Sequence, residues 1–201
     1  MPFQLLAALS LFAFVASITP GPNNIMLLAS GVKFGFFRTL PHMFGVGIGF
    51  MIMIMAVGLG IDQAFKAFPV LYTVLKWVSV VYMAWLAWKI ANAGPVKGDA
   101  SGAEKPMTFL AAALFQWVNP KAWAMILTGV TAYTVPANFL VSLIIMTAIF
   151  GAINIPSIAC WTGFGVVLRD MLRDPSRVKV FNYTMAALLL ASLIPVLMGL
   201  E

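Results

Sequence analysis

Long uncharged apolar runs dominate the chain and predict helices that cross a membrane. No charged side chain occurs in residues 1–32, 122–168 or 180–200. A membrane-spanning helix needs about 20 mostly apolar residues, so the first and last runs suffice for one span each and the middle run for two. Two further runs, interrupted only by His42 or Lys76, and a segment that contains Lys121 complete the pattern. We therefore predict six helices, at about 3–30, 39–61, 68–90, 107–132, 137–167 and 180–199.

The composition supports a membrane protein. Of the 201 residues, 62% are hydrophobic and 9% are charged, whereas a soluble domain averages about 45–50% apolar and about 25% charged residues. This excludes a soluble globular domain, a disordered chain and a nucleic-acid-binding module. A single cysteine, Cys160, and a single histidine, His42, argue against a disulfide framework and a metal centre. No carboxylate pair, Ser-His-Asp set or phosphate loop is present, so we expect that the protein is not an enzyme and needs no cofactor. We expect membrane lipids as partners.

The distribution of lysine and arginine predicts the orientation. The loops after the first, third and fifth predicted helices contain nine of the twelve cations, whereas the opposite set of loops and termini contains only Lys66. Short loops rich in Lys and Arg stay in the cytoplasm, so both termini are predicted to face away from it. The N-terminal run lacks the basic start of a signal peptide and is expected to remain as the first span. The nine cations are Lys33, Arg38, Lys89, Lys97, Lys105, Arg169, Arg173, Arg177 and Lys179.

The longest predicted loop, residues 92–106, divides the chain into two halves. Its content of Gly, Pro and Ser is that of a flexible connector, and the charge rule makes it cytoplasmic. The halves, 1–91 and 107–201, each contain three predicted spans, and because three is odd the second half must run inverted. This arrangement is typical of secondary transporters. We predict an all-α membrane protein, one transporter domain over residues 1–201 with a 3+3 inverted arrangement.

Proline beside asparagine is predicted to break helices 1 and 4, at residues 20–24 and 116–121. Proline removes an amide donor from the helix, and broken helices survive in a bilayer only beside protein or a water-filled cavity. Corresponding breaks in two halves indicate a transport site. Asn154 and Pro156 mark a third interruption, for which a purely structural kink is an equal alternative. The predicted substrate-binding residues are Pro20, Gly21, Pro22, Asn23, Asn24, Gln116, Asn119, Pro120, Lys121, Asn154 and Pro156.

Two ionisable side chains lie within predicted spans close to these breaks. Lys121 is 12 residues into a span that starts near residue 109, or roughly 18 Å at 1.5 Å per residue, which is farther than a lysine snorkels. No acidic residue lies mid-span, so a substrate carboxylate is a candidate partner. The alternative is a later start near Leu114, which would bring Lys121 to the cytoplasmic interface. We interpret His42 as a hydrogen-bonded interfacial residue, with proton relay as the alternative.

These motifs resemble those of the LysE/RhtB-type amino-acid exporters. The run Thr19–Asn24, followed by Gly45–Gly49, resembles the opening of that family, and Trp85–Lys89 and Phe115–Lys121 resemble its third and fourth spans. The similarity covers nearly the whole chain and is greatest to the RhtB branch, including its cysteine/O-acetylserine exporters. It implies export of amino acids or close derivatives across the bacterial inner membrane, driven by the proton gradient. In that membrane the outward termini predicted from the loop charges lie in the periplasm. It also implies that residues 20–24 and 119–121 lie on the family's characteristic motifs.

We therefore predict a secondary transporter that exports a small amino acid. The alternatives are a channel, which would pass solute without saturation or coupling, and a structural subunit of a larger membrane complex. A homo-oligomer is compatible with these patterns. Gly45-x-x-x-Gly49 and Ala159-x-x-x-Gly163 are expected to be sites of close helix packing.

Overall fold

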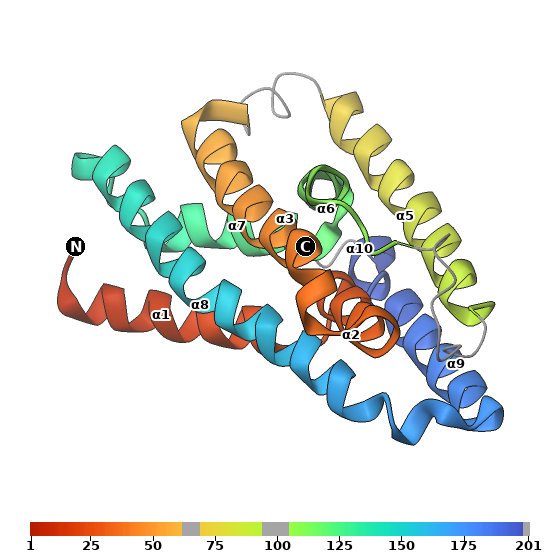
Figure 1. Ribbon diagram of the computed structural model, residues 1–201. Coiled ribbons are helices and arrows are strands. Elements are labelled where there is room, and N and C mark those ends of the chain that lie inside the picture. Colours follow the sequence, from red (N-terminus) through yellow and green to blue (C-terminus); the bar gives the residue numbers. More distant parts are fainter. Residues whose placement is uncertain (62–68, 94–104, 199–201) are drawn as a thin grey trace.

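The computed structural model describes residues 1–61, 69–93 and 105–198, and the regular elements in these ranges are all helical (Figure 1). Most of the predicted connector, residues 94–104, lies outside the described residues, as do Asp62 and Lys66. The main helices are α1 (Phe3–Ile18), α2 (Pro22–Phe34), α3 (Phe36–Ala56), α5 (Pro69–Ala91), α6 (Phe109–Phe115), α7 (Pro120–Tyr133), α8 (Phe139–Leu168), α9 (Pro175–Ala191) and α10 (Ile194–Met198). The short turns are η1 (Val57–Ile61), η2 (Gln116–Val118), η3 (Pro136–Asn138) and η4 (Met171–Arg173).

The two predicted breaks are confirmed. The first predicted helix divides into α1 and α2, which are bent by 50° relative to each other. Pro22 is the first residue of α2, where its missing N–H has no partner to lose. The fourth predicted helix divides into α6, the 3-10 turn η2 and α7. Asn119 begins α7 by accepting a hydrogen bond at Oδ1 from the Lys121 backbone N–H, at 3.1 Å.

Two other predictions about the helices are wrong. Pro156 does not interrupt its helix, because α8 continues from Phe139 to Leu168. A single proline removes one amide donor, whereas residues 20–22 combine two prolines with a glycine. The last helix was predicted at 180–199, but α9 runs from Pro175 to Ala191 and a separate short α10 follows. The start was misplaced because Arg177 and Lys179 ended the apolar run, although charged residues are compatible with a helix.

The length and hydropathy of the described helices support fewer spans than the six predicted. Two segments, Phe36–Gly60 and Pro136–Leu168, are long and apolar enough to cross a membrane within the described residues. The bent pair α1–α2 makes a third span if its two parts are counted together. The all-helical architecture of a membrane protein is therefore confirmed, whereas the six-span inverted arrangement stays a prediction.

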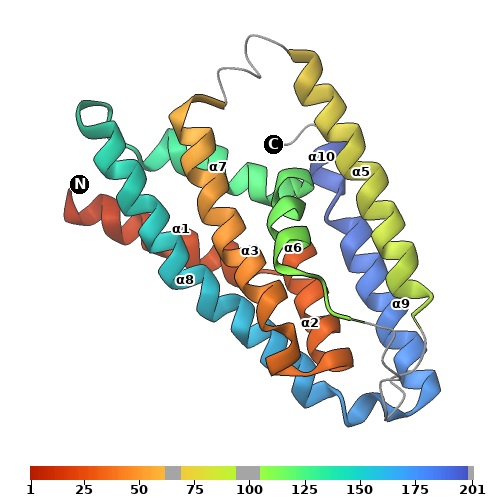
Figure 2. The same ribbon diagram turned by 45° about the horizontal axis from the view of Figure 1, so that its top comes forward.

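The two halves of the sequence interleave. Helix α8 packs against α1, α2 and α3, and α6 packs against α3. On the other side of the molecule α5 packs along α9, and both views show this pair side by side (Figures 1 and 2). Each of these pairs joins one helix from before the connector with one from after it. The residues of the two breaks are therefore brought together by contacts between the halves.

Glycines allow the closest of these helix contacts. A Cβ added at Gly45 would lie 2.3 Å from the Phe109 carbonyl oxygen of α6, and one at Gly49 would lie 2.5 Å from the Ala113 Cα. The packing role predicted for Gly45-x-x-x-Gly49 is thus confirmed.

The role predicted for Gly163 is wrong. An added Cβ at Gly163 meets nothing within 4 Å, whereas one at Gly165 would lie 2.2 Å from the Leu28 carbonyl oxygen of α2. Two residues correspond to about 200° around a helix, so these glycines point in nearly opposite directions. The small-residue motif therefore predicted the right helix for a close contact but the wrong glycine.

Candidate functional site

The C-terminal end of α1 is held by side chains from α2, α7 and α8. Asn24 Nδ2 donates to the carbonyl oxygens of Ser17 and Thr19, at 2.8 Å each, and Trp161 Nε1 donates to that of Ile18 at 3.0 Å. The last carbonyls of a helix lack intrahelical partners, and leaving them unpaired in an apolar environment costs several kcal/mol each. These bonds explain how the break persists inside the bundle.

Lys121 completes the capping of α1. Its Nζ donates to the Thr19 carbonyl oxygen at 2.8 Å, to Thr19 Oγ1 at 2.9 Å and to the Pro20 carbonyl oxygen at 3.2 Å. A lysine ammonium carries three donor hydrogens, and the end of a helix carries partial negative charge. The partner of this cation is therefore the broken end of α1, which sequence reasoning, restricted to charged side chains, did not consider.

Gly21 provides room for the lysine stem. A Cβ added at Gly21 would lie 2.5 Å from Lys121 Cδ and 3.1 Å from its Nζ. The backbone at Gly21 is extended, with φ −175°, so its conformation does not require glycine. The requirement for glycine is steric, because any side chain at this position would displace Lys121.

A pair of amides joins the two breaks. Asn23 Nδ2 donates to Gln116 Oε1 at 2.8 Å, and Gln116 Nε2 donates to Asn23 Oδ1 at 3.1 Å and to the Ala112 carbonyl oxygen at 2.9 Å. Gln116 is fully buried. The residues of the first break therefore contact those of the second, although they are 93 positions apart in sequence.

We expect the Asn23–Gln116 pair to behave as a unit in a double-mutant cycle. Either Asn23→Leu or Gln116→Leu alone should lower stability by about 1–3 kcal/mol, because each leaves the other amide without its side-chain partner. The double substitution should cost clearly less than the sum of the two. Thermal unfolding of the purified variants in detergent measures this, and additive effects would show that the two amides are not coupled.

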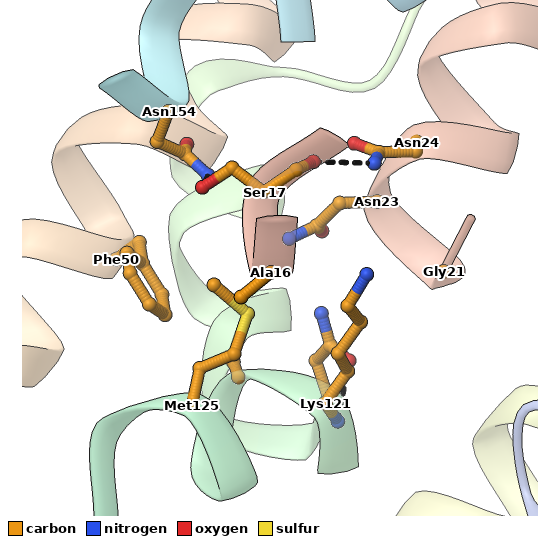
Figure 3. Close-up of a pocket in the computed structure, with 11 residues that line it drawn as sticks. Ala16, Ser17, Gly21, Asn23, Asn24, Phe50, Lys121, Met125 and Asn154 are labelled. Carbon is orange, nitrogen blue, oxygen red and sulfur yellow. Dashed lines mark hydrogen bonds between the residues drawn. The ribbon is translucent and has the colours of Figure 1, made fainter. Parts of the chain in front are cut away.

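A small cavity of about 20 Å³ lies between the breaks (Figure 3). A cavity needs about 10–15 Å³ on this measure to hold one water molecule, so the space admits water but no amino acid. An amino acid therefore does not fit into the cavity in this conformation. The cavity is lined by Ala16, Ser17, Gly21, Asn23, Asn24, Phe50, Asn119, Lys121, Ala122, Met125 and Asn154.

Asn154 lines this cavity and has one acceptor without a hydrogen-bond partner among the described residues. Its Nδ2 donates to Ser17 Oγ at 3.3 Å, while its Oδ1 is buried and has no hydrogen-bond partner among the described residues. The residue is 7% exposed. Figure 3 shows Asn154 and Lys121 reaching the site from different helices, α8 and α7. An unpaired buried oxygen costs about 1–3 kcal/mol.

Six of the eleven predicted site residues line the cavity: Gly21, Asn23, Asn24, Asn119, Lys121 and Asn154. Gln116 does not line the cavity but is hydrogen-bonded to Asn23, which does. Pro20, Pro22 and Pro120 lie in the chain at the two breaks. Pro156 lies within continuous α8 and does not line the cavity.

Sequence reasoning missed the other five lining residues. Ser17 had a detectable signal, since it is a polar residue in an uncharged run two positions before Thr19. Ala16, Phe50, Ala122 and Met125 are indistinguishable in the sequence from ordinary apolar packing residues.

His42 is not the interfacial, hydrogen-bonded residue that we predicted. It is 2% exposed, and neither ring nitrogen has a hydrogen-bond partner in the described part of the chain. Because α3 begins at Phe36 and packs against both α6 and α8, His42 lies nearly two turns inside a covered helix. It does not line the cavity.

Two helical breaks that meet at a buried polar centre, within a bundle of apolar helices, define a membrane transport protein. Comparison with known proteins gives the family: residues 14–197 match the LysE type translocator model, and the chain belongs to that family. The cysteine/O-acetylserine efflux protein of Escherichia coli K12 is 33% identical over 190 residues, covering 92% of this chain and 93% of the relative. The protein of the same description from Escherichia coli O157:H7 is 32% identical over 191 residues, covering 92% and 94%. No solved structure matches.

Proposed function

We propose that this protein is a secondary transporter that exports small amino acids or close derivatives, of the cysteine and O-acetylserine type, across the bacterial inner membrane. The substrate class is supported by the relatives, which are cysteine/O-acetylserine efflux proteins. The observation that carries the proposal is the cavity at the facing breaks, which Lys121 and Asn154 both line.

The broken first span has complementary poles for a zwitterion. Gly21 provides no side-chain cap for α2, so the first amide groups of that helix can bind a carboxylate. The carbonyls at the end of α1 attract a cation. Broken helices serve substrates in this way in other transporter folds. Asn154 Oδ1 is then available to a hydroxyl, thiol or other donor on the substrate.

The proposal includes the membrane topology and the energy source. Six spans, both termini in the periplasm and a cytoplasmic connector are supported by the nine-to-one distribution of loop cations. Coupling to the proton gradient is proposed from the family resemblance. Because the halves interleave through α8 and α6, we propose that access alternates by local separation of helices around the cavity, in place of two halves that rock as separate bodies.

Counterflow in liposomes tests the proposal. Purified protein should accumulate labelled L-cysteine in vesicles preloaded with unlabelled L-cysteine, and the initial rate should saturate with concentration. An imposed proton gradient should increase net transport. Flux without saturation or counterflow would indicate a channel, and no flux from the purified chain would favour a structural subunit. A matched comparison of extracellular metabolites in overexpressing and deletion strains then identifies the physiological substrate.

Asn154→Leu should raise the KM for substrates that carry a side-chain donor several-fold, because it removes the free acceptor from the cavity while keeping a similar volume. The KM for alanine, which has no side-chain donor, should change less. Asn182→Leu is the control: Asn182 is also buried, but its Nδ2 donates to the Ala93 carbonyl oxygen at 2.7 Å, away from the cavity. Equal effects of Asn154→Leu on cysteine and alanine would contradict the assignment.

A further inference from the structure

We propose that the three oxygens that hold Lys121 are the binding site for the substrate's ammonium group, and that Lys121 is a tethered competitor which the substrate displaces. We call the set of the Thr19 carbonyl oxygen, Thr19 Oγ1 and the Pro20 carbonyl oxygen the oxygen cage. This inference rests on the proposed function and deepens it, because it specifies which groups a substrate must carry.

The oxygen cage matches a primary ammonium group. Its oxygens lie 2.8, 2.9 and 3.2 Å from Lys121 Nζ, one for each donor hydrogen. The ammonium of an amino acid is the same chemical group, three N–H donors on an sp³ carbon. Two of the three oxygens are backbone carbonyls, so the cage recognises the ammonium independently of the substrate's side chain.

The cage can hold only one cation at a time. All three of its oxygens are engaged by Lys121, and two unit charges about 4 Å apart repel each other. A substrate ammonium can therefore enter only if Lys121 leaves. The displaced lysine then needs a new partner, since an unpaired cation in this setting is costly.

The substrate itself supplies that partner. In an α-amino acid the carboxylate is attached to the same carbon as the ammonium, so a substrate seated in the cage brings a carboxylate within a short movement of Lys121. The exchange leaves one ammonium in the cage and creates one lysine–carboxylate pair. No charge is left unpaired, and no side-chain carboxylate is needed.

This exchange selects zwitterions. An amine without a carboxylate would displace Lys121 and leave it without a partner. A carboxylate without an ammonium could pair with Lys121 only by leaving the oxygens of the cage without a cation. Only a ligand with both groups completes the exchange. Lys121 has a flexible four-carbon stem, which allows its ammonium group to follow the substrate carboxylate.

Direct binding to the purified protein tests the exchange, with three related probes. L-cysteine has both groups, cysteamine has only the ammonium, and N-acetyl-L-cysteine has only the carboxylate. The wild-type protein should bind labelled L-cysteine, and neither of the other two should compete. In Lys121→Met the cage has lost its cation, so labelled cysteamine should bind at least tenfold more tightly than to the wild type, while L-cysteine should lose its advantage over cysteamine.

Lys76→Met is the matched control, because Lys76 is also a lysine within a predicted span and does not line the cavity. It should bind all three probes as the wild type does. Thr19→Val provides a second variant that keeps Lys121 and removes one of the three oxygens. It should weaken L-cysteine binding about tenfold, as expected for one hydrogen bond to a charged group.

The outcomes separate this inference from the proposed function. If the wild-type protein transports L-cysteine but Lys121→Met binds cysteamine no better than the wild type does, the exchange is wrong and the transport function stands. Competition by N-acetyl-L-cysteine as strong as that by L-cysteine would also overturn it. If Lys121→Met cannot be purified, unchanged L-cysteine binding by Thr19→Val overturns it alone. Absence of L-cysteine transport by the wild type contradicts the proposed function first.

Discussion

Gly165→Ala should prevent α2 and α8 from packing and leave little folded protein in the membrane. The added Cβ would lie 2.2 Å from the Leu28 carbonyl oxygen and 3.1 Å from the Val32 backbone nitrogen. These are backbone atoms, so no side-chain rotation relieves the conflict. Extra methyl groups in a packed core cost about 1–3 kcal/mol, and a forced separation of two helix backbones should exceed that range.

The same interface contains a second glycine, which strengthens this expectation. A Cβ at Gly31 of α2 would lie 2.2 Å from the Thr162 carbonyl oxygen of α8. Each helix therefore presents a glycine to the backbone of the other, as in close helix pairs in membranes generally.

Gly163→Ala is the control for Gly165→Ala, because it adds the same methyl group to the same helix where nothing lies within 4 Å. Size-exclusion profiles and melting temperatures of fluorescent fusions in detergent compare the two. Equal yields and equal melting temperatures would show that α2 and α8 do not approach as closely as described.

Gly21→Ala should reduce amino-acid efflux at least tenfold while leaving the protein folded. The new Cβ would lie 2.5 Å from Lys121 Cδ, and a flexible lysine side chain can move away without disturbing the backbone. That movement takes Nζ off Thr19 and Pro20. The displaced cation is then out of place for the substrate carboxylate that it is proposed to pair with. Hydrogen bonds to charged groups are worth about 1.5–3 kcal/mol each, and every 1.4 kcal/mol corresponds to about tenfold in affinity.

Gly151→Ala is the matched control for this experiment. It requires a shift of similar size in another flexible side chain, since its Cβ would lie 2.8 Å from Met51 Sδ, and Gly151 does not line the cavity. Efflux from cells loaded with L-cysteine, normalised to the amount of folded protein, should be near wild-type for Gly151→Ala. Wild-type efflux from Gly21→Ala would show that the position of Lys121 does not matter for transport.

The sequence predicted the helical class and both breaks because these depend on local chemistry. Uncharged runs indicate apolar helices, and Pro20 and Pro22 around Gly21 cannot continue a helix. Helix ends were predicted less well, because Arg177 and Lys179 ended an apolar run without ending the helix. Pro156 was misread since a lone proline and a breaking pair look alike until the surrounding contacts are known.

Most residues of the candidate site were predicted from the sequence, but their hydrogen-bond partners were not. Asn23, Asn24, Asn119 and Lys121 were found because polar groups in apolar runs are conspicuous. Their partners were not, since the Thr19 and Pro20 carbonyls are present in every backbone and carry no sequence signal. The unpaired state of His42 was equally invisible, because it depends on how α3 is covered by α6 and α8.

The tightness of the polar centre has a consequence for a cell that keeps its metabolites inside. In this conformation the cavity has room for about one water molecule, so we expect no amino acid to pass through the protein at rest, however many copies the membrane contains. Loss of solute is then set by how often the helices part, and not by how wide a hole they leave. Variants that widen this cavity should leak amino acids, and the leak should slow the growth of cells on poor media.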